Sequence, residues 1–240
     1  MRTLMIAASA AAIAASGCNA ARSEEPGPSV SRNYQVGAFD KIEVAGPYEV
    51  SVTTGSAPSV RASGPDKAME RMVVEVEGGI LKIHPKKRGG FNFGWTKDHK
   101  VLVQVTVPAL RSADIAGSGD ISIDKVSGEE FEGGIAGSGA LKLGQVQVSL
   151  LSMDIAGSGE ATLGQGRARR VRYEIAGSGD IDGAGLAAEE ARVSIAGSGN
   201  VVANASGSAD VDIAGSGDVR VTGGAKCNVS KAGSGNVSCG

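Results

Sequence analysis

Acidic side chains flank a recurring Gly-Ser-Gly triplet in the second half of the chain, and carboxylate oxygens are the ligands that calcium prefers in proteins. One acid lies three positions before the triplet and another directly after it. If the triplets stack, acids of successive copies lie ~4.8 Å apart, where like charges repel by roughly 1 kcal/mol in water. A bound cation would offset this repulsion, and the candidate calcium ligands are Asp154, Glu160, Glu174 and Asp180.

Glycine-rich turns beside acidic residues are typical of calcium-binding β-rolls, which form a first alternative for this chain. In those proteins the glycine-rich turns lie on both sides of each coil and contain a doubled glycine, which the Gly-Ser-Gly triplets lack. The competing interpretation is that the acids are solvated turn residues that discourage edge-to-edge aggregation.

The repeats lack the residues that common catalytic sites need. Their serines do not lie in a Gly-Xaa-Ser-Xaa-Gly elbow, and the only histidines, His84 and His99, lie outside the repeats. Two histidines and a cysteine pair do not furnish a zinc site of normal spacing. Some β-helices cleave acidic polysaccharides with a carboxylate and a basic residue, and Asp182 with Arg220 is the candidate pair for that third interpretation. We predict that the chain is not an enzyme.

A basic and aromatic segment at residues 86–100 is the part of the chain least like the repeats. Aromatic rings beside cations suit a sugar, an anionic lipid head group or a protein partner. The alternative is that the rings fold back and plug the end of the solenoid, because exposed aromatic side chains are costly unless they are used. The candidate binding residues are Phe91, Phe93, Trp95 and Lys97.

Seven Gly-Ser-Gly triplets recur at intervals of 20 and then 18 residues, which indicates a stacked-repeat architecture. The position two residues before the triplet is isoleucine in six copies and lysine in the last, so we expect a buried column that ends at an exposed lysine. The unit is too short for a strand–helix–strand repeat, which needs about 30 residues. We therefore predict an all-β fold, a parallel β-helix (β-solenoid) with 18–20-residue coils, in preference to a meander of hairpins. The handedness rule makes it right-handed.

Residues 38–110 are predicted to begin and cap this solenoid, with the repeats at 111–240. The segment 42–52 overlays 113–123 without a gap, with apolar residues at the inward positions. Alternating runs at 73–76, 80–83 and 101–107 predict further strands, and residues 65–72 predict a short helix with proline in its first turn. Such a cap would hide the open edge of the stack.

Residues 1–18 have the pattern of a bacterial export signal, with Arg2, an apolar run and small residues before Cys18. The tetrapeptide at 15–18 resembles the lipobox of lipoproteins, in which the cysteine is lipidated; plain secretion with cleavage near Ala20 is the alternative. By the same resemblance, Asn19 implies the outer membrane. Residues 19–37 contain little that can be buried and predict a flexible tether.

Cys227 and Cys239 lie within one repeat length of each other in a chain predicted to leave the reducing cytoplasm, so we predict a disulfide that closes the last coil. Two buried, reduced cysteines are the alternative. The formal net charge of −2 provides no basic field for nucleic acid.

The repeated Ile-Ala-Gly-Ser-Gly-Asp-Ile motif and the segments 39–44 and 107–110 resemble the bacterial head GIN domain family, described as putative auto-transporter adhesins. The resemblance covers residues 38–240 and implies a right-handed parallel β-helix in the cell envelope, without catalytic residues or a cofactor. We therefore expect a non-catalytic lipoprotein, held at the membrane by its lipid, that contacts an envelope protein or glycan. A calcium-stabilised binding module is the alternative.

Overall fold

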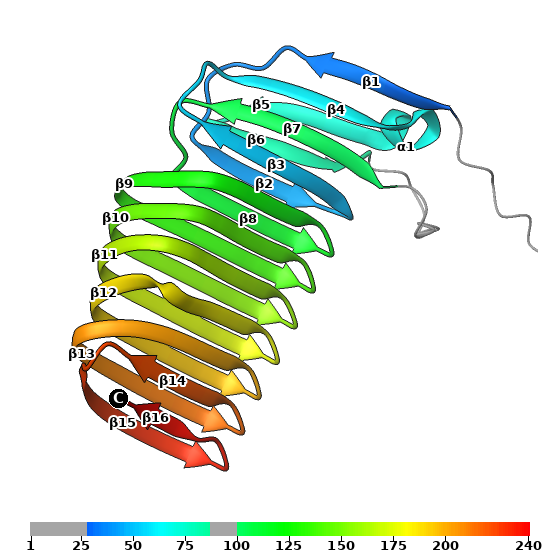
Figure 1. The fold of residues 1–240 in the computed structure, drawn as a ribbon. Helices are drawn as coiled ribbons and strands as arrows, with labels where there is room; N and C mark the ends of the chain where they lie inside the picture. The colour runs from blue at the N-terminus through cyan, green and yellow to red at the C-terminus, as the bar shows by residue number, and fades with distance from the viewer. Residues whose placement is uncertain (1–27, 87–99) are drawn as a thin grey trace, which may run out of the picture.

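The repeats form a β-solenoid in the computed structural model, which describes residues 28–86 and 100–240 (Figure 1). Each long strand begins directly after one triplet, makes a full coil and ends on the first glycine of the next. Neighbouring coils pair in parallel, between residues 20 apart in the first coils, as in Leu141 with Ala161, and 18 apart in the last, as in Val201 with Val219. The predicted all-β, parallel solenoid is confirmed. The long strands are β9 (Asp120–Gly137), β10 (Ala140–Gly157), β11 (Glu160–Gly177), β12 (Asp180–Gly197) and β13 (Asn200–Gly215).

The corner at each triplet depends on its first glycine, which has a positive φ in every copy, from 116° at Gly117 to 141° at Gly197. Residues with a Cβ are strained there. The serine that follows donates its backbone N–H to the glycine carbonyl of the preceding coil, as in Ser138 to Gly117 at 2.8 Å. The corners therefore stack through backbone hydrogen bonds.

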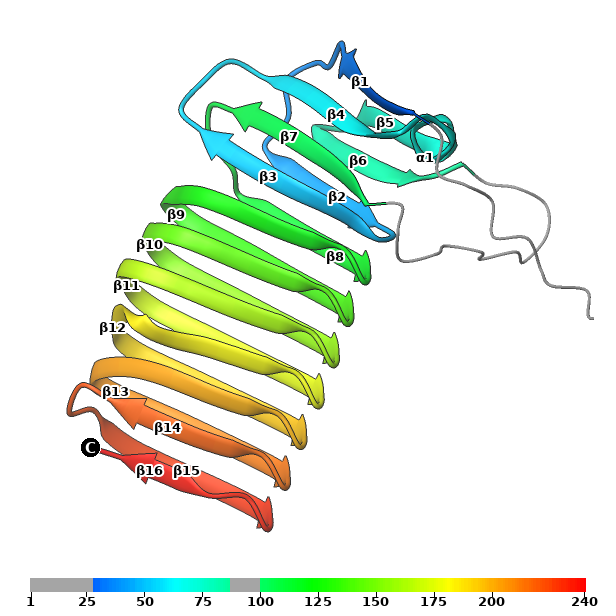
Figure 2. The same cartoon turned by 45° about the vertical axis from the view of Figure 1, so that its right-hand side comes forward.

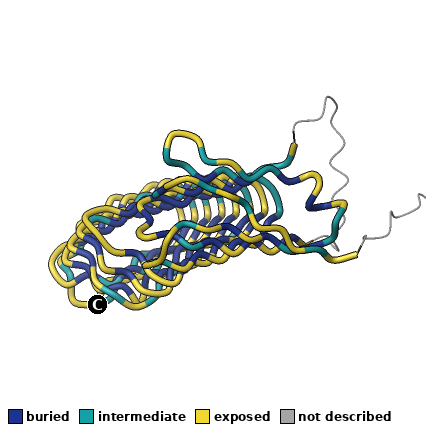
Figure 3. Tube along the Cα trace, turned by 90° about the horizontal axis from the view of Figure 1, so that it is seen from above, coloured by how far each residue is buried: buried dark blue, intermediate teal, exposed yellow. Residues whose placement is uncertain are grey.

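The interior of the solenoid is lined by the apolar columns that the periodicity predicts. Figure 3 looks along the stack and shows buried segments alternating with exposed ones around the coil. The isoleucines two positions before the triplets are all buried, and burying such a side chain contributes about 1.5–3 kcal/mol. In the last copy Lys231 occupies this column and is exposed, as predicted.

The region before the repeats continues both faces of the solenoid and then closes it (Figure 2). β2 pairs in parallel with β8, and β3 with β9, in the register that the overlay of 42–52 on 113–123 predicts. The predicted short helix is present, and its Ala68 and Met69 are buried. These elements are β2 (Lys41–Ala45), β3 (Tyr48–Thr54), β4 (Ser59–Pro65), α1 (Asp66–Arg71), β5 (Met72–Glu77), β6 (Ile80–Pro85), β7 (Val101–Val107) and β8 (Ser112–Gly117).

The predicted flexible tether at 19–37 is wrong for its last part, because β1 (Ser29–Tyr34) pairs antiparallel with β4. Val30 and Tyr34 pack against the core, and Arg32 forms an ion pair with Asp66 at 2.5 Å. This short segment buries enough apolar surface to be ordered although its composition is mostly polar.

The last coil is formed by β14 (Asp218–Thr222), β15 (Lys226–Gly233) and β16 (Val237–Cys239). A disulfide joins Cys227 to Cys239, with their Cα atoms 6.5 Å apart, which confirms the predicted pairing. Lys231 Nζ donates to the carbonyl of Gly235 at 2.7 Å and so contributes to the last corner. Within the described residues, no helix is long and apolar enough to cross a membrane.

Candidate functional site

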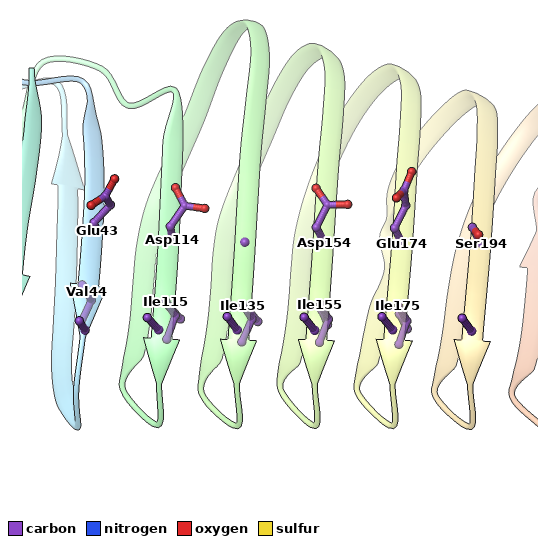
Figure 4. A pocket seen from close by; sticks show the side chains of 17 residues that line it. Glu43, Val44, Asp114, Ile115, Ile135, Asp154, Ile155, Glu174, Ile175 and Ser194 are labelled. Atoms are coloured by element: carbon purple, nitrogen blue, oxygen red, sulfur yellow. The ribbon is translucent and has the colours of Figure 1, made fainter. Parts of the chain in front are cut away.

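A shallow groove with a volume of about 610 Å³ runs along one face of the solenoid, across the strands from β2 to β12 (Figure 4). It follows from alternation along each strand: where the isoleucine points inward, the residues on either side of it point outward. The outward position before the isoleucine forms the wall of the groove. The position after it forms the floor.

The floor consists of one alanine from each strand, and these side chains are all partly or fully exposed. Because alanine is the smallest side chain with a Cβ, the row is lower than the wall and leaves an apolar channel. The floor offers methyl groups and no side-chain hydrogen-bonding atom. The alanines are Ala45, Ala116, Ala136, Ala156, Ala176 and Ala196.

The wall is acidic, since Glu43, Asp114, Asp154 and Glu174 stand in one row in Figure 4. The groove lining contains no basic residue. Ser112 Oγ donates to Asp114 Oδ2 at 2.7 Å and so orients that carboxylate.

Gly134 interrupts the acidic wall and creates a notch between Asp114 and Asp154, with which it lies in register on the two neighbouring strands. A Cβ at position 134 would overlap Asp114 Oδ1, so this carboxylate leans into the space that the missing side chain leaves. Glu132 is exposed two residues earlier on the same strand and points to the same side. The notch is therefore a small space surrounded by carboxylates.

The pKa of Asp154 is raised above its usual value, first by partial burial and then by the neighbouring charges of Glu174 and Glu132; Arg172 acts in the opposite direction. Like charges disfavour the ionised carboxylate. The negative charges along the wall therefore add to the effect of burial, and the guanidinium of Arg172, two residues before Glu174 on the same strand, partly offsets them.

The four predicted calcium ligands do not form one cluster. Asp154 pairs in register with Glu174 on the groove face, whereas Glu160 pairs with Asp180 on the other side of the glycine corner. Among residues 28–86 and 100–240, no three acidic, histidine or cysteine side chains are arranged to hold a metal ion.

The acids directly after the triplets have a structural role that the sequence did not indicate. Asp180 Oδ1 accepts a hydrogen bond from the backbone N–H of Asn200 at 3.0 Å, and Asp120 accepts one from Ala140 at the same distance. Ala140 occupies the aspartate position in the coil before Glu160 and has no carboxylate to accept this bond. The backbone N–H of Glu160 therefore donates to the Gly139 carbonyl instead. Aspartate at this position therefore caps the next coil.

We expect calcium to have little effect on stability, because only two of the four candidate ligands lie together on either face. The melting temperature in millimolar calcium should stay within about 1 °C of that in a chelator, since a ligand stabilises only the state that binds it. Differential scanning calorimetry measures this. A rise of several degrees with calcium, absent with magnesium, would restore the calcium-stabilised module.

The candidate catalytic pair is also separated. Asp182 and Arg220 lie in one outward column, but Val202 stands between them in register, so they are two strand spacings, ~9.6 Å, apart. Asp182 Oδ1 accepts the backbone N–H of Ala184 at 3.1 Å. Both residues line a second open groove of about 520 Å³, in which Val202 keeps their strands two spacings apart.

Two predictions fall on residues that the structure does not describe. Cys18 lies in the segment 1–27, and the candidate binding residues Phe91, Phe93, Trp95 and Lys97 lie in the segment 87–99. Both remain predictions.

Sequence reasoning missed the groove itself. It placed the acids of successive copies one strand spacing apart and interpreted them as calcium ligands, but it did not extend the row back to Glu43 or identify the channel beside it. The alanine that precedes each triplet was visible as a column in the sequence, and its small size was the signal for the floor.

The stacked parallel coils and the groove define a β-solenoid with an open, groove-bearing face. The family model described as "Putative auto-transporter adhesin, head GIN domain" matches residues 38–225, and the chain belongs to this family. Among curated proteins none matches significantly.

Solved structures with similar folds include a putative adhesin from Bacteroides fragilis, with 22% identity, a TM-score of 0.79 and coverage of 88% of this chain and 97% of that one. A structure described as a putative lipid binding protein from Parabacteroides distasonis has 26% identity and a TM-score of 0.71, covering 89% and 97%. A putative adhesin from Parabacteroides merdae has 18% identity and a TM-score of 0.67, with the same coverage. The first and third establish the fold alone.

Proposed function

We propose that the protein is a non-catalytic lipoprotein of the bacterial cell envelope, anchored in the outer membrane through Cys18, whose solenoid contacts another macromolecule of the envelope or cell surface. The observation that carries this proposal is the groove, which combines an apolar floor with an acidic wall over six strands. The family description as an adhesin supports contact rather than catalysis. The name of the relative with 26% identity makes a lipid surface the main comparison in any binding test.

The anchor is tested by Cys18→Ala in the full chain. Without the thiol no lipid is attached, so we expect the protein to move from the membrane fraction to the soluble envelope fraction, because stable anchoring depends on the acyl chains. Immunoblots of fractionated cells measure the shift, with Ser16→Thr as a control that keeps the cysteine. Membrane retention of the Cys18→Ala protein would contradict lipid anchoring.

The contact surface is tested by filling the groove. In the soluble Cys18→Ala chain, Ala156→Trp should abolish saturable binding to purified cell envelopes, because the indole occupies the middle of the floor. Ser122→Trp, which places the same ring at an exposed position on the opposite side of the coil, should bind like the parent. Equal binding by both variants would show that the groove is not the contact surface. Binding to protein-free lipid vesicles would instead identify a lipid ligand.

A further inference from the structure

The groove has the shape of a channel for an extended chain. Its acidic wall runs from Glu43 to Ser194 over five strand spacings, ~24 Å, which equals the length of about seven residues of an extended polypeptide. The channel crosses the strands, so its occupant lies along the solenoid axis.

The charge of the groove specifies a cationic occupant. Four carboxylates line one side, the lining has no basic residue, and the carboxylates of Asp114 and Asp154 have no ion pair within the described chain. Burial raises the pKa of Asp154 first, the charges of Glu174, Glu132 and Asp114 raise it further, and Arg172 acts against them. A cation entering the groove would relieve repulsion that the folded protein carries when free.

The notch at Gly134 gives this cation a position. Asp114 and Asp154 lie one strand to either side of Gly134, so an ammonium or guanidinium group above the glycine reaches both carboxylates. Charge-assisted hydrogen bonds from such groups are the strong ones, and a guanidinium can bind a carboxylate bidentately. Ser112 already orients the Asp114 carboxylate at 2.7 Å.

The floor favours aliphatic side chains over sugars. The methyl groups of Ala136 and Ala156 can cover the methylene stems of lysine or arginine, which lie along apolar surfaces while the charged group stays at the polar edge. The hydroxyl groups of a sugar would find no side-chain partner on this floor and no aromatic ring in the groove lining. Burying unpaired hydroxyl groups is unfavourable.

We propose that the groove binds an extended basic polypeptide, with one lysine or arginine side chain in the Gly134 notch between Asp114 and Asp154. The proposal deepens the proposed function, since it rests on the groove being a contact surface and names its partner as a protein segment. Further basic residues of the partner face Glu43 and Glu174, and its small or aliphatic residues lie on the alanines.

The test measures the affinity of fluorescein-labelled acetyl-(Ala-Lys)5-amide for the full chain carrying Cys18→Ala, by fluorescence anisotropy at low and high salt. We expect Asp114→Asn combined with Asp154→Asn to weaken peptide binding by at least about tenfold, because the double variant loses a charge-assisted contact. Glu160→Gln, which removes a carboxylate from the same coil on the other side of the corner, should change it by less than about twofold. Gly134→Leu, which blocks the notch without changing charge, should weaken binding as the double variant does.

Folding is checked separately for each variant by its melting temperature, and acetyl-(Ala-Glu)5-amide and glucosamine oligomers serve as comparison ligands. Equal affinity of the double variant and the parent, equal binding of the acidic peptide, or tighter binding of the glucosamine oligomer would each overturn the proposal. If Ala156→Trp abolishes envelope binding while the double variant has no effect on it, the contact surface stands and the basic-peptide proposal fails. If the peptide binds at the notch but the Ala156→Trp protein still binds to cell envelopes as the parent does, the proposed function fails instead.

Discussion

Replacing Gly137 with alanine is expected to lower the free energy of unfolding by about 3 to 5 kcal/mol. Gly137 has a φ of 137°, where a Cβ costs about 1–3 kcal/mol of backbone strain. The new methyl group would also overlap the Gly117 carbonyl oxygen, which accepts the Ser138 N–H at 2.8 Å. The substitution therefore strains the corner and pushes apart the hydrogen bond that stacks it on the preceding coil.

Two matched glycines separate these causes. Gly128→Ala has the same kind of backbone, with a φ of 143°, but no atom lies within 4 Å of its added Cβ, so it should cost only the strain. Gly37→Ala meets no atom and has no positive φ, so its effect should stay within about 0.5 kcal/mol. Urea unfolding followed by circular dichroism measures all three. An equal loss at positions 128 and 137 would show that close packing of the corners contributes nothing.

The solenoid could be predicted because its repeat fixes which residues are neighbours along the axis. Once Ile115 and Ile135 are aligned by their triplets, parallel pairing places them side by side, and the same alignment extends back to Val44. This reasoning also located the disulfide, since Cys227 and Cys239 fall in the last copy.

Other features could not be predicted in this way, because they depend on contacts or side-chain sizes that the repeat period does not determine. The pairing of β1 with β4 joins a polar segment to a strand outside the repeats. The groove depends on the relative height of two outward rows, and the notch on a single departure from the pattern, Gly134. The candidate calcium ligands were grouped because stacking places the acids of successive copies one strand spacing apart, whereas the corner puts Asp154 and Glu160 on different faces.

The rigidity of the solenoid is what makes its acidic row a usable surface. Each carboxylate of the wall is attached to a strand that is hydrogen-bonded on both sides, so the spacing of Asp114 and Asp154 is fixed before any partner arrives. A prearranged site loses less conformational entropy on binding than a flexible one. The repulsion stored in the row is tolerated because stacked coils supply the stability elsewhere.

Contacts across the core also cannot be read from the repeat, and the effect of Gly183→Leu on stability tests them. Two other coils have leucine at this inward position, Leu143 and Leu163, so a consensus argument predicts a gain in stability. The structure predicts a loss of about 3 kcal/mol, because a Cβ at position 183 would lie 2.7 Å from Tyr173 Oη and 3.0 Å from the carbonyl oxygen of Val202. Tyr173 fills the space that the glycine leaves.

The compensating change is Tyr173→Val, which gives this coil the residue that Val193 has in the next one. Alone it should cost about 2–4 kcal/mol by leaving a cavity beside Gly183. Removing the phenol should cost little beyond this cavity, because its buried oxygen has no hydrogen-bond partner in the described structure. Burial also raises the pKa of Tyr173, so the group is neutral and its removal leaves no charge unpaired. Together with Gly183→Leu the total cost should fall at least about 1 kcal/mol below the sum of the single costs.

A double-mutant cycle from urea unfolding curves measures this coupling, and Val50→Ala combined with Gly183→Leu is the control pair, because the buried Val50 lies on β3, four strand spacings from β12. Additivity of the Tyr173 and Gly183 changes within about 0.5 kcal/mol would mean that the two residues do not occupy complementary volumes. Strong coupling would establish that each coil is packed as an individual set of large and small side chains. The period then determines the path of the backbone, and the exceptions to it determine how the interior is filled.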